Sequence, residues 1–331
     1  MRSLVHPILA LMAVGLAAAT IPGLNAAPPA RARAVGINVV LNTGITPAIL
    51  SQLGRHGSVR DVVESIRAVT LQAPVGNLAA IRSLPYVAAA NPDAERTTGP
   101  VAAAEVTDFS DGISTWNLDA INVTDYGAGR HVDYDGTGVY VAVLDSGLVR
   151  TWPYYFPRER IATEYAISLG GGGGGVGWVS SQPNKWENDQ DSHGTHVTST
   201  ILGYQFPFPP VSGPVNGVAP KSTVIPVKVI NQNGRTWSSV VARGIAYVAD
   251  LKAGPLADYP VVINMSLGGP GLDAMEKVAI DYAVEQGVIV VASAGNGGTS
   301  GMGYPGAYQP VISAAACGWV GEWTPDEWWW L

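Results

Sequence analysis

The sequence predicts an α/β domain with a mainly parallel sheet, preceded by a small α+β module. From Gly138 onward, short and almost continuous apolar runs recur, with helical patterns between them. Such runs are typical of strands buried on both faces, and strands that alternate with helices indicate an α/β domain. Residues 34–93 show a different order, β-α-β and then α-β, which fits a ferredoxin-like sandwich.

The elements of the N-terminal module follow from local patterns. A proline stands at the second position of one apolar stretch, as is typical of a helix start, and a β-branched, alternating stretch follows it. A second helical pattern ends at Pro85. The expected order is the strand Val35–Leu41, the helix Thr46–Leu53, the strand Val59–Leu71, the helix Val75–Leu84 and the strand Tyr86–Ala90.

Two helices of the larger domain have clear signals. Ser238–Leu251 carries apolar residues at helical spacing. Asp273–Gln286 opens with an aspartate that can cap the helix and closes before Gly287, which suits a helix C-terminus. The strands predicted around these helices are Val139–Leu144, Val224–Ile230, Val261–Met265, Val288–Ala292 and Val311–Ala316.

Composition and charge narrow the possible functions. The 331 residues are 47% hydrophobic and 14% charged, a globular composition, and the formal net charge of −7 argues against a nucleic-acid partner. Cys317 is the only cysteine, which excludes an intramolecular disulfide and a cysteine-rich metal site. We therefore expect a large globular domain with no nucleic-acid partner.

The N-terminus has the pattern of a signal peptide over residues 1–27. Arg2 gives a positive start, Ile8–Ala19 is an apolar run, and Asn25–Ala27 supplies small residues for cleavage. A retained membrane anchor is the alternative, but the apolar run is short for a membrane span. We expect an exported, extracellular protein with no membrane association after signal removal.

The small, polar stretch Asn91–Asp111 is predicted to be a linker with a cleavage site.

Asp145 is the first residue that could carry chemistry. It directly follows the apolar run Val141–Leu144, and side chains at the carboxyl ends of parallel strands form the functional edge of such a sheet. An ionised carboxylate at a buried strand end is costly without a partner. The alternative is an ordinary aspartate in a strand-end turn.

His193 and His196 lie in the segment Asp191–Val197. His193 could accept a proton from a nucleophile while a buried aspartate holds its tautomer. A metal site is the alternative, since the histidines are three residues apart. However, Gly194 stands where a zinc hydrolase motif of the His-Glu type has its glutamate, and no third ligand is obvious. His196 is predicted to be a packed, hydrogen-bonded histidine.

Two further segments follow predicted strands. Asn296 lies in a glycine-rich loop, where its amide could donate to a developing oxyanion, although Asn-Gly after a strand is also a common turn. Ser266, Leu267 and Gly268 belong to a stretch of mostly small residues, so an extended peptide could pair with their backbone as an added strand.

Together these segments resemble the motifs of the subtilisin-like serine proteases, also called subtilases or the peptidase S8 family. The resemblance runs from about Trp116 to Ala316, and the motifs stand in the order of that family. The matching segments are Leu144–Gly147, His193–Val197, Gly217–Pro220, Asn264–Gly269 and Ala294–Asn296.

The resemblance implies a three-layer α/β/α fold and an endopeptidase that acts on polypeptide substrates. It assigns Asp145 to orientation, His193 to general base and Asn296 to oxyanion donor, with Ser266, Leu267 and Gly268 binding the substrate backbone. Residues 34–93 resemble the inhibitory propeptide of the family, an intramolecular inhibitor and folding aid. The implied division is a signal peptide at 1–27, a propeptide-like domain with linker at 28–100 and a catalytic domain at 101–331. No cofactor is expected for the chemistry, and a structural calcium ion is frequent in the family.

Two departures from the family pattern qualify this expectation. The 35 residues after Asn296 lack the Gly-Thr-Ser-Met-Ala motif of the nucleophile, and Ser300 lies too close to Asn296 to replace it. We therefore expect the nucleophile beyond residue 331 and no activity in the chain as given. Thr198 and Ser199 stand where the family usually has Ala-Gly, so a small local shift is expected. A non-catalytic peptide-binding protein of the same fold is the main alternative, and a metal hydrolase the next.

Overall fold

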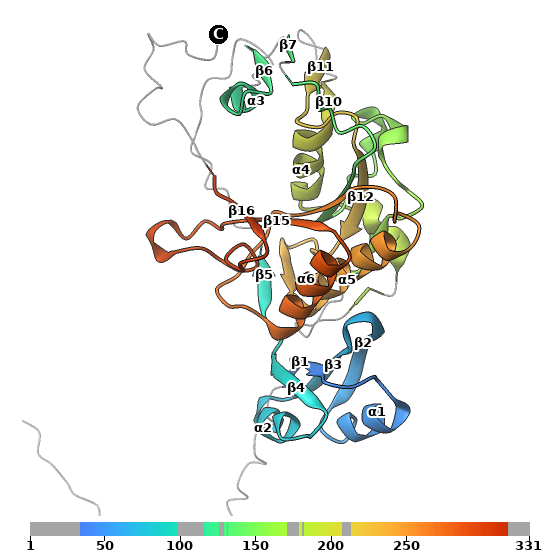
Figure 1. Ribbon diagram of the computed structural model, residues 1–331, viewed down its shortest axis with the longest axis vertical. Coiled ribbons are helices and arrows are strands. Elements are labelled where there is room, and N and C mark those ends of the chain that lie inside the picture. Colours follow the sequence, from blue (N-terminus) through green and yellow to red (C-terminus); the bar gives the residue numbers. More distant parts are fainter. Residues whose placement is uncertain are drawn as a thin grey trace, which may run out of the picture. The chain divides into compact units, whose positions relative to one another are not determined.

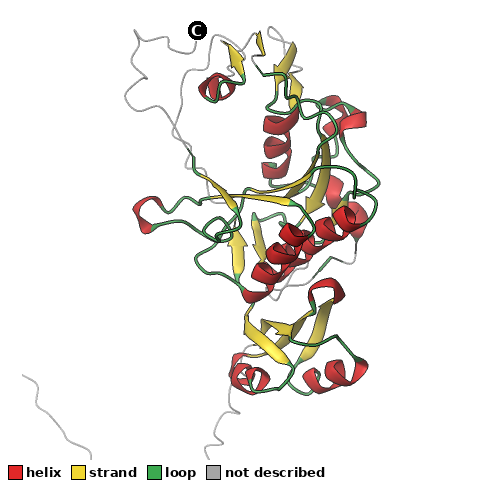
Figure 2. Ribbon diagram, viewed as in Figure 1, coloured by secondary structure: helices red, strands yellow, loops and turns green. Residues whose placement is uncertain are grey.

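The computed structural model describes residues 34–97, 116–125, 129–130, 132–170, 179–180, 182–206 and 213–316. All of them belong to one unit, Arg33–Leu331. The predicted signal peptide, most of the predicted linker and Cys317 lie outside the described residues. Two sheets organise the rest, one of four strands and one of six (Figures 1 and 2).

The N-terminal module is an antiparallel sheet with strand order β2-β3-β1-β4 and two helices. Its β-α-β-β-α-β succession is the ferredoxin-like order, with one strand more than the sequence predicted. The elements are β1 (Ala34–Leu41), α1 (Pro47–Leu53), β2 (Ser58–Val63), η1 (Glu64–Ile66), β3 (Ala68–Pro74), η2 (Val75–Asn77), α2 (Leu78–Arg82) and β4 (Val87–Pro92).

The prediction of one strand over Val59–Leu71 was wrong. A 3-10 turn at Glu64–Ile66 divides the segment, and β2 and β3 fold back on each other as an antiparallel pair. Arg67 makes the reversal with a φ of 50°, a conformation in which glycine or asparagine is the usual residue. The alternating pattern runs through the turn, so the sequence gives no turn signal there.

The larger sheet has strand order β16-β15-β14-β8-β12-β9, and every neighbouring pair is parallel. Five of its strands match predicted ones within a few residues, and the short edge strand β9 was not predicted. The strands are β8 (Tyr140–Asp145), β9 (Ile167–Ser168), β12 (Thr223–Lys228), β14 (Val261–Met265), β15 (Ile289–Ser293) and β16 (Ile312–Ala314).

Helices cover both faces of this sheet. In β8, Ala142 and Leu144 join the core built around α5 (Ser238–Ala253) and α6 (Ala274–Glu285). The alternate residues Val141 and Val143 join a separate core with Leu202 of α4 (His193–Leu202). Because successive side chains of a strand point to opposite faces, these cores lie on opposite sides of the sheet. The fold is therefore the expected three-layer α/β/α arrangement.

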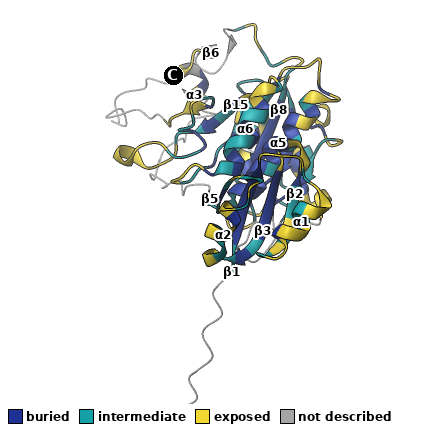
Figure 3. Cartoon of the chain, turned by 60° about the horizontal axis from the view of Figure 1, so that its bottom comes forward, coloured by how far each residue is buried: buried dark blue, intermediate teal, exposed yellow. Residues whose placement is uncertain are grey.

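The N-terminal module packs on the helix layer formed by α5 and α6. Ile37 and Val39 of β1 face the module's own helices, whereas Val40 on the opposite face joins the large core. Burial on both sides explains why β1 is almost continuously apolar. Figure 3 shows β1 and the central strands of the larger sheet coloured as buried.

Short elements complete the described residues. They are α3 (Trp116–Ala120), the strand pairs β6 (Thr124–Asp125) with β7 (Gly129–Arg130), β10 (Gly203–Phe206) with β11 (Gly213–Asn216) and β5 (Glu95–Thr97) with β13 (Arg235–Trp237), and the 3-10 helices η3 (Trp152–Tyr154), η4 (Arg158–Arg160), η5 (Pro183–Glu187) and η6 (Gly298–Ser300). None of the helices in the described parts of the chain is long and apolar enough to cross a bilayer.

Candidate active site

His193 and Asp145 form a hydrogen-bonded pair at the carboxyl edge of the larger sheet. Asp145 ends β8, and His193 is the first residue of α4. The Nδ1 atom of His193 lies 2.9 Å from Oδ1 and 3.0 Å from Oδ2 of Asp145. The Asp145 side chain is fully buried, while 22% of the His193 side chain is exposed. One ring edge is thus held by a buried carboxylate while the side chain keeps access to solvent.

Two glycines allow close backbone contacts around this pair. A Cβ atom added at Gly194 would lie 2.5 Å from the carbonyl oxygen of Gly147, well inside van der Waals contact. Gly147 itself has a φ of 95°, and a Cβ there would lie 2.3 Å from the carbonyl oxygen of Trp186. The start of α4 therefore packs backbone to backbone against the turn after Asp145.

The buried carboxylate of Asp145 is well supplied with donors. The backbone N–H and the hydroxyl of Ser146 donate to Oδ1 at 2.7 Å and 3.2 Å. The same hydroxyl accepts a bond of 2.8 Å from the N–H of Gly194, so it links the strand end to the helix start. These bonds offset the cost of burying the carboxylate and fix it toward His193.

The electrostatics favour a positive charge on His193. The hydrogen bond to the carboxylate of Asp145 raises the pKa of His193 above its usual 6.5, against the opposing effect of burial, and the nearby Asp191 and Asp189 act in the same direction. Burial also raises the pKa of Asp191. An imidazole in this setting can take up a proton at its other nitrogen and be stabilised as the cation.

Asp189 was missed by the sequence reasoning, although it holds the start of α4 in place. Its carboxylate accepts hydrogen bonds from the N–H of Ser192 at 2.8 Å and from the N–H of Thr195 at 3.0 Å. Ser192, in the cap position, has a φ of 67° and makes no side-chain cap of its own. Asp189 thus caps the helix from outside the usual position.

Lys228 was missed as well. It pairs in register with Asp145 across β12 and β8, is 5% exposed, and its Nζ donates to the carbonyl oxygen of Ser146. Burial lowers the pKa of Lys228. A lysine that ends a buried apolar strand is the signal that could have identified it.

Asn296 and the segment Ser266–Gly268 lie at the same edge of the sheet. They follow β15 and β14, the successive parallel neighbours of β8, so all three strands end on the same side. The hydroxyl of Ser293 donates to the carbonyl oxygen of Leu267 at 3.2 Å and joins the two loops. Asn296 is exposed, and no contact within the described residues links its side chain to His193. The structure therefore pairs Asp145 with His193 and leaves Asn296 unpaired with them.

The prediction for His196 was wrong. Its side chain is exposed on α4 and makes no hydrogen bond to the described residues, whereas its backbone carbonyl accepts from the hydroxyl groups of Ser199 at 2.7 Å and Thr200 at 3.4 Å. Position 196 lies one turn from His193 but on the solvent side of the helix. Across the described segments there is no group of three or more His, Cys, Asp or Glu residues that could hold a metal ion, so no residue is assigned to calcium or zinc.

Comparison with known proteins places these residues in a family. Residues 136–319 match the model of the subtilase family, peptidase S8. Over 187 residues the chain is 36% identical to subtilisin from Bacillus pumilus, covering 55% of this chain and 58% of the relative. Subtilisin E from Bacillus subtilis strain 168 is 35% identical over the same length, with 42% of the relative covered. The chain thus spans about half the length of the curated relatives it matches.

A solved structure shows the same fold. The crystal structure of fervidolysin from Fervidobacterium pennivorans, described as a keratinolytic enzyme related to subtilisin, aligns with a TM-score of 0.56 and 21% identity, over 87% of this chain and 44% of that one. The family match spans more than half of the chain and includes Asp145, His193 and Asn296. The chain belongs to the subtilase family of serine peptidases.

Proposed function

We propose that the chain is part of an exported serine endopeptidase precursor that hydrolyses peptide bonds. The buried Asp145–His193 pair is the observation that supports this most strongly, because it joins an oriented base to a carboxylate that can stabilise its cation. Asp145 orients His193, which acts as general base, and Asn296 donates to the oxyanion. Ser266, Leu267 and Gly268 bind the substrate backbone as an added strand.

The reaction follows from these roles. A nucleophilic hydroxyl attacks the carbonyl carbon of the peptide bond while its proton passes to Nε2 of His193. The Nδ1 atom stays bound to Asp145, so the imidazolium forms beside a carboxylate. His193 then returns the proton to the leaving amine, and water repeats the sequence on the acyl intermediate.

The proposal requires a nucleophilic serine. No hydroxyl in the described segments hydrogen-bonds to Nε2 of His193, and the family motif is missing from the 35 residues after Asn296. We place the nucleophile in sequence beyond Leu331. Serine-directed fluorophosphonate should therefore not label the 331-residue chain, and stoichiometric labelling of Ser300 would contradict this assignment.

The N-terminal part of the chain is proposed to keep the enzyme inactive until it is removed. Residues 1–27 serve as the signal peptide, residues 28–100 as inhibitory propeptide and linker, and residues 101–331 belong to the catalytic domain. Support comes from the apolar packing of the module on α5 and α6 and from strand β5, which pairs with β13 of the larger domain. Residues 91–97, the described part of the predicted linker, are the end of β4 and the strand β5 with buried Asp93 and Arg96 between and within them, so the prediction of a loose linker was wrong there.

The test is hydrolysis of an unstructured protein such as casein by the full-length gene product. The wild type should cleave it, and His193→Ala should lose several orders of magnitude in kcat. His196→Ala is the matched control, because His196 lies on the same helix but is exposed. Asn296→Ala should cost about 10²–10³ in kcat, the magnitude known for subtilisin itself.

A non-catalytic peptide-binding protein is the competing function. Binding of unfolded casein without any cleavage by the folded, full-length product would favour it and contradict the proposed protease. Equal loss of activity in His193→Ala and His196→Ala, with both variants folded, would reverse the assignment of the base.

A further inference from the structure

The segment that follows β4 crosses the surface of the larger domain as an extended strand. Strand β5 pairs antiparallel with β13, with Glu95 opposite Trp237, Arg96 opposite Thr236 and Thr97 opposite Arg235. On its other side, a Cβ added at Gly269 would lie 2.8 Å from the carbonyl oxygen of Glu95. Strand β5 therefore lies between β13 and Gly269, the residue that directly follows the segment proposed to bind a substrate backbone. An extended peptide bound by strand addition would occupy the same kind of position.

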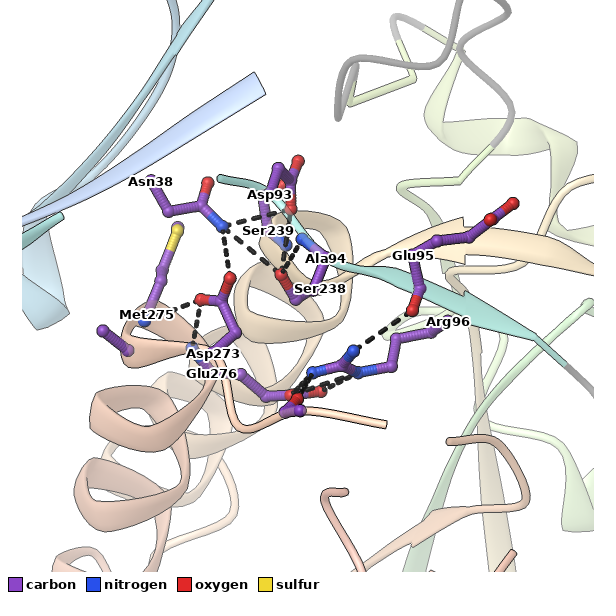
Figure 4. Close-up of polar contacts among 12 residues, drawn as sticks. Asn38, Asp93, Ala94, Glu95, Arg96, Ser238, Ser239, Asp273, Met275 and Glu276 are labelled. Carbon is purple, nitrogen blue, oxygen red and sulfur yellow. Dashed lines mark hydrogen bonds and ion pairs between the residues drawn. The ribbon is translucent and has the colours of Figure 1, made fainter. Parts of the chain in front are cut away.

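The side chain of Arg96 is buried in the larger domain (Figure 4). Its Nε lies 3.3 Å and 3.2 Å from the two carboxylate oxygens of Glu276, and its Nη2 lies 2.5 Å from Oε2. Nη2 also donates to the carbonyl oxygen of Gly271 at 2.9 Å. Both side chains of the ion pair are fully inaccessible to solvent. The site therefore offers several hydrogen-bond acceptors to the N–H groups of one guanidinium.

The residue that precedes Arg96 on the strand, Glu95, lies in a solvent-exposed environment instead. The ion pair between Glu95 and Arg235 is on the surface, with 41% and 63% of the side chains exposed. Since side chains alternate along a strand, Arg96 points into the interior while Glu95 points away from it. The larger domain thus binds the side chain of Arg96 and leaves that of Glu95 exposed to solvent.

The charges around the Arg96 guanidinium favour a cation at this position. Burial raises the pKa of Glu276 against the pull of Arg96, so the carboxylate is costly without its partner. The guanidinium of Arg96 is also buried, yet Glu276, Asp273 and Asp93 together raise its pKa. A planar guanidinium can satisfy Glu276 and the carbonyl oxygen of Gly271 together, whereas a lysine ammonium lacks this fork geometry.

We propose that the pocket formed by Glu276 and the carbonyl oxygen of Gly271 is a subsite that selects an arginine side chain of the substrate, and that Arg96 occupies it as a built-in mimic. The inference rests on the proposed endopeptidase function and on release of the N-terminal segment. That release would take away the guanidinium that pairs with Glu276. A substrate strand lying where β5 lies would restore the charge with an arginine at the matching position.

The pocket can be tested in the 331-residue chain without any activity. Arg96→Ala should lower the thermal midpoint, and millimolar ethylguanidinium should restore part of the loss. Ethylammonium at the same ionic strength should restore less, because it lacks the planar fork. Arg235→Ala removes an exposed arginine from the neighbouring strand and is the matched control, for which ethylguanidinium should have no effect. Equal effects of the two compounds on both variants would overturn a guanidinium-selective pocket.

Substrate selection is tested with the processed full-length enzyme. A peptide library carries arginine, lysine or its neutral isostere citrulline at each position before the cleaved bond. At one position kcat/KM should favour arginine over citrulline by about 10- to 100-fold, the value of hydrogen bonds to a charged group. Glu276→Leu should abolish that preference, whereas Glu285→Gln, on the same helix and exposed, should keep it. If the Arg96→Ala protein does not fold, the peptide library alone tests the proposed arginine subsite.

The stability experiment and the peptide library together distinguish failure of the arginine subsite from failure of the proposed endopeptidase function. Cleavage with no arginine preference at any position overturns the subsite and leaves the endopeptidase intact. Failure to cleave any peptide overturns the proposed function and the substrate claim with it. In that case, rescue by ethylguanidinium would assign the Arg96–Glu276 pair to structure alone.

Discussion

At the residue scale, the contact between His193 and Asp145 has a consequence that can be measured in solution. The hydrogen bond raises the pKa of His193 above 6.5, so Asp145→Asn should lower it. Because the folded pKa is the higher one, protonated His193 stabilises the fold below about pH 6.5, and this contribution is lost as the pH rises through the folded pKa. Imidazole titration by NMR in the wild type and the variant measures the shift. An unchanged His193 pKa in a folded Asp145→Asn protein would contradict the assigned contact.

A second prediction concerns Thr198, which replaces the usual alanine of the family. The residue is fully buried in α4, and its hydroxyl has no partner among the described residues. Thr198→Val keeps the shape and removes the hydroxyl, so the free energy of unfolding should rise by about 1 kcal/mol. Urea unfolding of the full chain measures it. Thr200→Val, on the exposed side of the same helix, should stay within about 0.5 kcal/mol of the wild type. A loss of stability in Thr198→Val would show that its hydroxyl has a partner.

At the scale of elements, the helix start that carries His193 depends on backbone contact. Gly194→Ala would place a methyl group 2.5 Å from the carbonyl oxygen of Gly147 and push α4 away from Asp145. We expect a loss of about 1–3 kcal/mol in the free energy of unfolding, together with loss of the elevated His193 pKa. Gly76→Ala is the control, because a Cβ there meets nothing within 4 Å. If Gly194→Ala kept the stability and the His193 titration of the wild type, close packing at this point would be disproved.

The elements that the sequence predicts well are those whose signals are local. The helix α6 begins and ends next to its predicted caps, because the Asp273 side chain accepts from the N–H of Met275 and Gly287 adopts a φ of 82°. The reversal at Arg67 escaped prediction because a non-glycine residue takes the positive φ there. Propensity alone cannot reveal a conformation that the surrounding packing imposes.

The candidate site also contains residues that the sequence could predict and residues that it could not. The roles of Asp145 and His193 could be anticipated from a strand end and a motif, and the structure brings the two side chains together. Lys228 supports them through the distant carbonyl oxygen of Ser146, and its place at the end of an apolar strand was a usable signal. Asp189 binds the nearby N–H groups of Ser192 and Thr195, and the sequence does not distinguish it from an ordinary surface carboxylate. His196 was mispredicted because the side of α4 that faces the sheet depends on tertiary packing.

At the scale of the whole molecule, the N-terminal module and the larger domain share a buried polar network (Figure 4). Asp93 of the module accepts bonds of 2.9 Å from the N–H of Ser239 and from the hydroxyl of Ser238, at the start of α5. The amide of Asn38 donates both to Asp93 and to Asp273, at 3.1 Å each. The two domains are thus joined through carboxylates that lie close together and out of water.

This arrangement predicts an unusual pH dependence of stability. Burial, aided by the nearby Asp273, raises the pKa of Asp93 above 3.8, against its hydrogen bonds to Ser239 and Ser238. For a group whose folded pKa is raised, the stabilising contribution is complete below the unfolded pKa and is lost as the pH rises through the folded value. Asp93→Asn removes this titration. The free energy of unfolding of the variant, relative to the wild type, should therefore improve as the pH rises above about 4 and level off once the pH, scanned to 8, has passed the folded pKa of Asp93.

Urea unfolding of the full chain across that pH range measures the difference. Asp135→Asn is the control, because hydrogen bonds from Lys221 and Thr137 lower the pKa of Asp135 and its contribution changes only below about pH 4. Its difference from the wild type should therefore be flat over the same range. A flat difference for Asp93→Asn as well would mean that Asp93 stays ionised in the folded chain throughout. The network would then hold the module by its hydrogen bonds to α5 at every pH tested, with no weakening as the pH rises.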